Sequence, residues 1–140
     1  MVANLVCEPF AATPFVAGPP LAERRVAIIS SAALIRRGDM PFSFGSPEVR
    51  FVPADTPPDE LLISHVSINF DRSGFQRDAN TVFPLWRLRE LADEGFIGAV
   101  APTHYTVMGS TDPSAMVESA DQISGQLQQE RIDAVLLSPV

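Results

Sequence analysis

Three short apolar runs, separated by helix-like segments, limit the folds that are open to this sequence. They are residues 25–30 (RVAIIS), 96–100 (FIGAV) and 132–137 (IDAVLL). Continuous apolar runs that contain β-branched residues are typical of strands buried on both faces of a parallel sheet. A weaker strand is predicted at residues 49–52, because a short apolar stretch there precedes the turn residues 53–58.

The segments between these runs carry helical periodicity and helix-start signals. One helix is predicted to begin near Pro84, since proline is tolerated at the first helical position, and to end at Gly95. Another is predicted to begin at Asp112, an N-cap residue that is followed by Pro113. Apolar residues recur at helical spacing in both: Leu85, Leu88, Leu91 and Ala92, then Met116, Val117, Ala120, Ile123 and Leu127.

Alternating strands and helices predict an α/β fold. We expect a three-layer sandwich with a mainly parallel sheet, Rossmann-like or flavodoxin-like, that lacks its C-terminal part because no crossover helix follows residues 132–137. The length of 140 residues fits one domain, residues 1–140. Within it, residues 1–22 are expected to form a Pro-rich extended arm, and residues 23–140 the sheet and helices.

Charge and composition exclude several classes of function. The net charge is −7, and all 10 basic residues are arginines, so no lysine is available for a Walker A motif or a Schiff base. The acidic balance disfavours binding to nucleic acid or to an anionic membrane. No apolar stretch is long enough to cross a bilayer, and the first residues lack the basic region of a signal peptide. The single cysteine, Cys7, cannot form an internal disulfide, so we expect a cytoplasmic protein.

A dense group of polar residues, interleaved with phenylalanines, follows the weaker strand. It contains His65, Asn69, Asp71, Arg72, Gln76, Arg77, Asp78 and Asn80. Two interpretations are open: a solvated loop held by its aromatic residues, or the wall of a binding pocket. In the second, Arg72 could hold a carboxylate in bidentate geometry, while His65 and Asp71 could orient a base or a substrate amine.

A second candidate segment follows the strand predicted at residues 96–100. Ligands of parallel α/β sheets bind beyond the carboxyl ends of the strands, here just after Ser30, Val100 and Leu137. Thr103, His104, Tyr105 and Met108 are expected at one such end, where His104 is either catalytic or a structural hydrogen-bonding residue. The two histidines lack HxxxH or HExxH spacing, so no metal site is predicted, and no GxGxxG or GxSxG motif is present.

Residues 64–113 resemble a known family. Their sequence is similar to the selenoprotein B subunit of the glycine, sarcosine, betaine and D-proline reductases: SHVSINFDRSGFQRDANTVFPLWRLRELADEGFIGAVAPTHYTVMGSTDP. The resemblance extends through IDAVLLSPV to Val140 and, more loosely, back through TPFVAGPPLAERRVAIISSAAL and RRGDMPF. It implies a reductase subunit that cleaves a carbon–nitrogen bond of a small amine or amino-acid substrate, together with other subunits of a reductase complex.

The same resemblance implies the site residues. In the family, the strand similar to IDAVLLSPV is followed by selenocysteine or cysteine, which attacks the substrate carbon and displaces the amine. No cofactor is expected in this chain, and the nucleophile is expected just beyond Val140, which suggests a reading frame ended at a UGA codon. The positions that match the family's motifs are His65, His104 and Asp71, expected to be catalytic, and Asn69, Arg72, Gln76 and Tyr105, expected to bind substrate.

Two other functions stay open from the sequence. The chain could be a non-catalytic module that binds a small ligand or a partner, in which case Val140 is a genuine end. It could also be a metal-dependent hydrolase built on His65, His104, Asp71 and Asp78, which metal analysis would reveal. Apolar surface left uncovered by an absent C-terminal segment could drive formation of a homodimer.

Overall fold

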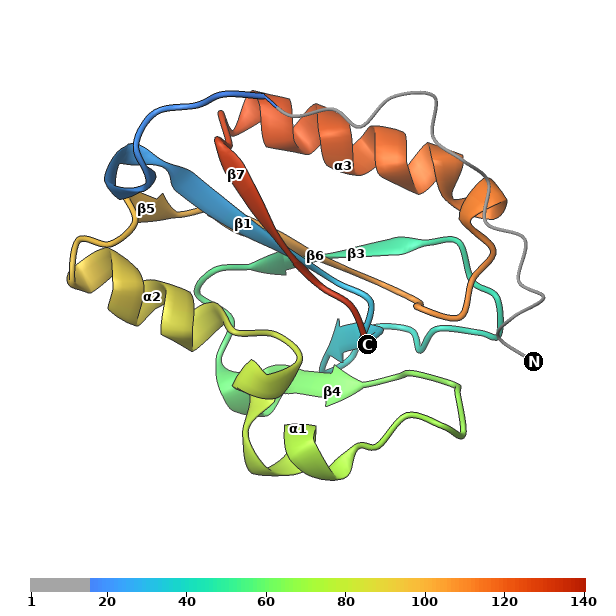
Figure 1. Cartoon of the computed structure of the whole chain (residues 1–140). Coiled ribbons are helices and arrows are strands. Elements are labelled where there is room, and N and C mark those ends of the chain that lie inside the picture. Colours follow the sequence, from blue (N-terminus) through green and yellow to red (C-terminus); the bar gives the residue numbers. More distant parts are fainter. Residues whose placement is uncertain (1–15) are drawn as a thin grey trace, which may run out of the picture.

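The computed structural model describes residues 16–140, and its centre is a five-stranded mixed sheet (Figure 1). Strand β1 (Arg25–Ser30) pairs in parallel with β7 (Ala134–Ser138) on one side. On its other side, β1 pairs in parallel with β5 (Ala99–Val100) near its start and with β6 (Thr103–Val107) near its end. Strand β3 (Val49–Pro53) completes the sheet and runs antiparallel to β6.

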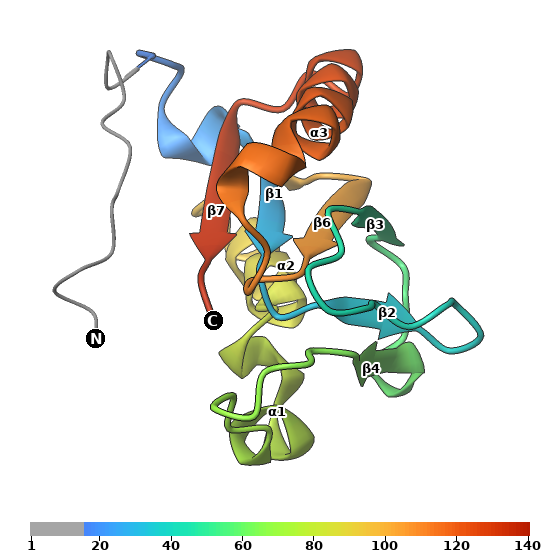
Figure 2. The same ribbon diagram turned by 90° about the vertical axis from the view of Figure 1, so that its right-hand side faces the viewer.

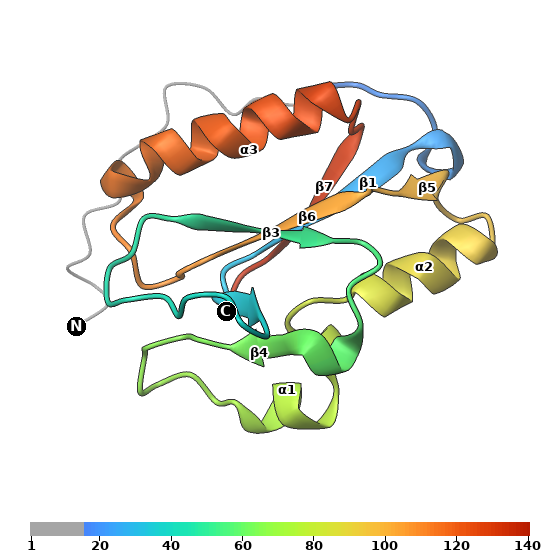
Figure 3. The ribbon, with the colours of Figure 1, turned by 180° about the vertical axis from the view of Figure 1, so that it is seen from behind.

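Helices cover the two faces of this sheet, so that each face carries its own apolar cluster. Helix α3 (Val117–Gln129) covers one face, where Ile123 joins a cluster with Ala27 and Tyr105. Helix α2 (Leu85–Asp93) lies on the other face, where Leu85 and Leu88 belong to the cluster that contains Ile28. Figure 3 shows the sheet between these two helices from behind. The predicted α/β class with mostly parallel strands is confirmed, with the difference that β3 is antiparallel.

A small second sheet lies beyond the carboxyl ends of the parallel strands. It consists of β2 (Leu34–Arg36) and β4 (Leu61–Ile63), which pair antiparallel, and helix α1 (Ser73–Arg77) follows it. Figure 2 shows β7, β1 and β6 pointing toward this layer. The sequence pattern does not predict these elements, because 3 to 5 residues are too few to display a periodicity.

The signals for the two helix starts are confirmed. Pro84 is the N-cap of α2, and Gly95, with φ of 76°, lies just after the end of that helix. Asp112 accepts a hydrogen bond from the Ser114 N–H (2.9 Å) and caps the 3₁₀ turn η5 (Pro113–Met116), which continues as α3. Asp112 thus makes the capping hydrogen bond that was predicted, whereas Pro84 makes no side-chain capping bond and stands one position before the first helical residue of α2.

The strand predicted at residues 96–100 is only partly correct. Strand β5 comprises Ala99–Val100 alone, and after Pro102 the chain resumes the sheet as β6. Pro102 has no N–H to donate, so it interrupts the hydrogen-bond ladder along β1. The chain nevertheless continues beside β1, as β5 before the proline and as β6 after it. Residues 103–107 are therefore a strand and not the loop expected there. The carboxyl end of this strand lies at Val107.

The N-terminal arm is described only in part. Residues 1–15, including Cys7, lie outside the described residues, and the 3₁₀ turn η2 (Leu21–Glu23) replaces extended chain at the end of the predicted arm. Two further 3₁₀ turns are η3 (Pro58–Glu60) and η4 (Ala79–Thr81). Among residues 16–140, no helix has the length and apolar character that a membrane span requires.

Candidate active site at the carboxyl end of the sheet

Ser31 joins the carboxyl ends of β1 and β7. Its backbone N–H donates to the Ser138 carbonyl (3.1 Å), and its hydroxyl oxygen accepts the N–H of Val140 (2.8 Å). The register that aligns Ser30 with Ser138 in the parallel pair produces this contact. The chain that leaves β7 therefore runs directly past the first residue after β1.

A second set of contacts holds the same end of the sheet from the side of α2. The hydroxyls of Ser30 and Ser138 both donate to the carbonyl of Val82, at 2.8 and 2.9 Å. Ser30 Oγ also accepts the N–H of Ala32 (3.2 Å). Because Ser30 is fully buried, these bonds satisfy groups that water cannot reach and hold β1, β7 and the segment before α2 together.

A cavity of about 430 Å³ opens beside Ser31, between the loop after β6 and the first turns of α3. Its walls include Ser31, Met108, Met116, Val117, Ala120 and Asp121. This is the place where ligands bind in parallel α/β sheets, beyond the carboxyl ends of the strands. Ser31 belongs both to the wall of the cavity and to the contact with Val140, so the cavity adjoins the end of the chain that follows β7.

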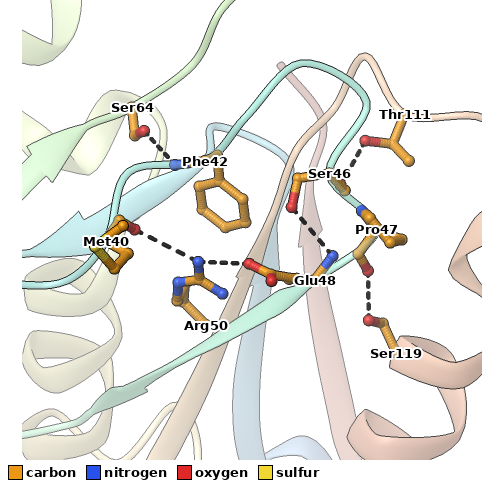
Figure 4. Close-up of polar contacts among 9 residues, drawn as sticks. All are labelled: Met40, Phe42, Ser46, Pro47, Glu48, Arg50, Ser64, Thr111 and Ser119. Atoms are coloured by element: carbon orange, nitrogen blue, oxygen red, sulfur yellow. Dashed lines mark hydrogen bonds and ion pairs between the residues drawn. The ribbon is translucent and has the colours of Figure 1, made fainter.

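The loop that leads into β3 is hydrogen-bonded to the loop after β6 and to α3 (Figure 4). The Thr111 hydroxyl donates to the carbonyl of Ser46 (2.7 Å), and the Ser119 hydroxyl donates to the carbonyl of Pro47. These two bonds tie the loop after β6 and the first turn of α3 to one backbone segment. Thr111 lines the cavity, and its hydroxyl is engaged with the protein itself.

Gly109 allows the loop after β6 to pass close to Ser31. Its N–H donates to the Ser31 carbonyl (3.0 Å), and a Cβ at this position would lie 2.8 Å from that oxygen. We therefore expect Gly109→Ala to lower the free energy of unfolding by about 1–3 kcal/mol, because the backbone would have to shift.

Gly125→Ala is the matched control for this prediction. Gly125 lies in the interior of α3, and a Cβ there meets nothing within 4 Å, so the change should raise the free energy of unfolding by about 1 kcal/mol through helix propensity. Urea denaturation measures both effects. Equal stabilisation by the two substitutions would contradict the close approach at Gly109.

Two of the predicted site residues, His65 and Arg72, lie together in the segment after β4. Arg72 Nη2 donates to the His65 carbonyl (2.6 Å). The buried imidazole packs on Phe70, its Nδ1 accepts the Ser67 N–H (3.1 Å), and its Nε2 has no partner among the described residues. Burial, and secondly the Arg72 charge, lower the pKa of His65 below its ordinary value of 6.5. The ring is therefore neutral at pH 7, with its proton on Nε2.

The other predicted residues of this segment make different contacts from those expected. Asp71 accepts hydrogen bonds from the N–H and the hydroxyl of Ser73 (2.9 and 3.0 Å), which lower the pKa of its carboxyl. Asn69 and Gln76 are exposed. The expected contact between Asp71 and a histidine is not formed in this structure, because the carboxylate closes a local turn with a residue two positions ahead.

His104 lies inside β6, on the face that carries α2. Its ring is fully buried, Nδ1 accepts the backbone N–H of Ile28 (3.0 Å), and Phe83 packs edge-on against it at 5.8 Å between ring centroids. His104 Nδ1 thus accepts a β1 N–H that lies between the residues of β1 paired with β5 and those paired with β6. Burial lowers the pKa of His104 to about 4; a smaller opposing effect comes from Glu130, and Arg89 adds to the lowering.

Tyr105 points to the opposite face of the sheet from His104, since successive side chains of a strand alternate. It is fully buried in the cluster under α3, and its hydroxyl has no partner among the described residues. Burial and the charge of Glu130 raise the pKa of Tyr105 to about 12. His104 and Tyr105 were expected to share one pocket. Because they lie on opposite faces of the sheet, they cannot both face it.

Comparison with known proteins decides the family. The family model for glycine/sarcosine/betaine reductase selenoprotein B matches residues 60–140, more than half of the chain. The chain belongs to this family. The matched range includes β7 and all seven predicted site residues, whereas Ser30 and Ser31 lie outside it.

A curated relative of this selenoprotein B family member is the D-proline reductase subunit gamma of Acetoanaerobium sticklandii. The two are 32% identical over 121 residues, which cover 84% of this chain and 49% of the relative. The chain thus spans about half the length of that relative. No solved structure matches the chain significantly.

Sequence reasoning on this selenoprotein B family member selected the position after Ser30, which is Ser31, but missed Asp121 as a cavity residue. Asp121 reaches the cavity through the packing of α3 beside the loop after β6. The strand-forming composition of residues 103–107 (THYTV) is the signal that could have placed the end of this strand at Val107. Among residues 16–140, no group of three or more His, Cys, Asp or Glu side chains could hold a metal ion.

Proposed function

We propose that this chain is part of a reductase subunit that cleaves a carbon–nitrogen bond of a small amine or amino acid. The proposed nucleophile is a selenocysteine or cysteine that follows Val140 in the full-length protein. The supporting observation is the place of Ser31, which binds the N–H of Val140 and also lines the cavity at the carboxyl end of the sheet. A residue that follows Val140 would leave the sheet beside this cavity.

The position suits the proposed chemistry. A selenol, or a thiol with a lowered pKa, is ionised near neutral pH and can attack the substrate carbon while the amine departs with the electron pair of the broken bond. A substrate nitrogen that enters as an ammonium group leaves as the neutral amine and needs no further proton. His65, whose buried Nε2–H has no partner among the described residues, is our candidate for a hydrogen-bond donor to the substrate. Arg72 holds the loop of His65 and is our candidate for binding a substrate carboxylate.

His104 has a different role in this proposal. Its Nδ1 is occupied by Ile28 and its ring is sealed beneath Phe83, so we assign it to holding β1 in register and not to proton transfer. The remaining subunits of the reductase are part of the proposal, because the relative from Acetoanaerobium sticklandii is itself named as a subunit.

Replacing the residue after Val140 by serine in the full-length protein is expected to abolish release of amine from substrate in the complete reductase. Cys7→Ser is the matched control and should retain activity, because Cys7 lies outside the range that the family model matches. Amine release is measured directly. A serine variant with unchanged activity would reject the proposal, as would a codon after Val140 that is neither UGA nor a cysteine codon.

A further inference from the structure

Strand β7 forms one edge of the sheet, and this edge is apolar on both faces. Within residues 16–140 β7 pairs with β1 alone, and Figure 2 shows it at the rim of the sheet. The side chains of Val135, Leu136 and Leu137 are 37, 39 and 68% exposed. Successive side chains of a strand alternate, so Val135 and Leu137 lie on one face and Leu136 on the other. Such a pattern is typical of a strand inside a sheet and not of an edge.

The opposite edge of the same sheet, strand β3, is protected in ways that β7 is not. Arg50 stands within β3 and forms an ion pair with Glu48 (2.6 Å), and Pro53 ends the strand. Charged residues and prolines keep edge strands from pairing with other chains. Strand β7 contains neither, although the chain carries a net charge of −7. Of the two edges of this sheet within residues 16–140, β7 is therefore the one open to further pairing.

The backbone of β7 offers hydrogen-bonding groups at this edge. The Ser138 carbonyl accepts the Ser31 N–H (3.1 Å), so Ser138 directs its backbone groups toward β1. The direction of these groups alternates along a strand, so Leu136 also directs its groups toward β1, while Val135 and Leu137 direct theirs outward. A further strand beside β7 would satisfy the outward groups and cover the apolar side chains.

The sequence of β7 is complementary to itself in the antiparallel direction. With a two-fold axis at Leu136, this residue lies opposite Leu136 of the partner subunit, and Val135 lies opposite Leu137 of the partner subunit. Apolar pairs then form on both faces of the joined sheet, and the outward backbone groups of the two strands meet. A two-fold interface requires this self-complementarity, because the same surface serves both copies.

We infer that two copies of this chain associate through β7, antiparallel about a two-fold axis at Leu136, and form one continuous sheet. The pair closes at two copies, because it uses the open edge of each and the β3 edge is protected. The edge is five residues long, so it buries less than the roughly 800 Å² per partner of a standard interface, and the dimer is weak and concentration-dependent. This association is independent of the proposed reductase chemistry.

Sedimentation equilibrium of the 140-residue chain from about 10 µM to 1 mM should show monomers and dimers in exchange. Leu137→Lys should weaken dimerisation roughly tenfold or more, because two-fold symmetry places the new charge twice at the apolar edge. Ile68→Lys is the matched control: it adds the same charge in place of a side chain that is 94% exposed and lies after β4, and it should leave the dissociation constant unchanged. A chain that stays monomeric throughout, because another segment covers β7 or nothing does, would overturn the inference. Equal effects of the two lysine variants would overturn it as well.

Disulfide formation tests the register without the lysine variant. In a Cys7→Ser background, Leu136→Cys places a thiol at the two-fold axis, opposite its own copy. Directly opposed residues of antiparallel strands have Cβ atoms about 4.5–5.5 Å apart, close to the span of a disulfide. Oxidised glutathione should therefore yield covalent dimers on a non-reducing gel, whereas Ile68→Cys in the same background should stay largely monomeric. Equal dimer yields from the two variants, or none from Leu136→Cys, would contradict pairing about Leu136.

Discussion

Lowering the pH from 7 to 4 should reduce the free energy of unfolding by about 3 kcal/mol through His104 alone. Burial lowers the pKa of this imidazole to about 4 in the folded protein, against an ordinary value of 6.5. Between these two values the unfolded chain takes up a proton and the folded protein does not. The contribution of His104 to stability is therefore complete above pH 6.5 and is lost progressively as the pH falls toward 4.

Urea denaturation of the wild type and of His104→Asn at several pH values measures this effect. Asparagine keeps an oxygen that can accept the Ile28 N–H but has no group that titrates, so the stability difference between the two proteins should shrink from pH 7 to pH 4. His65→Asn is the control, because the lowering of the His65 pKa is smaller, and most of the acid dependence should remain. Parallel pH profiles for wild type and His104→Asn would contradict the assignment.

The same histidine shows where sequence reasoning reached its limit. Strands β1 and β7 and the starts of α2 and α3 follow from local signals, namely apolar runs, Asp112 and Pro84. The predicted burial of residues 132–137 on both faces is wrong, because β7 pairs with β1 alone and the side chains of Val135, Leu136 and Leu137 are exposed. Strand β6 carries no such run, since a histidine stands at its second position and polar threonines at its first and fourth. Its place in the sheet depends on pairing with β1 and β3, which are distant in the chain, and such pairing leaves no local periodicity.

The candidate site was predictable in its location but not in its residues. The rule that ligands bind beyond strand ends selects the position after Ser30, where the structure has a cavity lined by Ser31. The rule also selects the position after Val100. That selection is wrong, because Val100 ends a strand of only two residues and the chain continues beside β1 as β6. Ser31 and Asp121 meet at the cavity through the parallel register and the packing of α3, and a single sequence contains neither fact.

Phe83→Ala should lower the free energy of unfolding by about 3–5 kcal/mol, the other large effect that the structure predicts. The ring is fully buried in the cluster between the sheet and α2, and it packs edge-on against His104. Truncation removes apolar contacts and leaves a cavity that the surrounding strands cannot close, which adds to the loss of buried area.

The effect of this substitution should reach the candidate site as well. Phe83 directly follows Val82, whose carbonyl holds the hydroxyls of both Ser30 and Ser138 at the end of the sheet. Phe44→Ala is the control, because that ring is 86% exposed and its loss should change stability by less than about 0.5 kcal/mol. Hydrogen exchange at the N–H of Val140 should accelerate in Phe83→Ala and not in Phe44→Ala. If exchange there is unchanged while global stability falls, Phe83 supports the core alone and the end of β7 is held by Ser31.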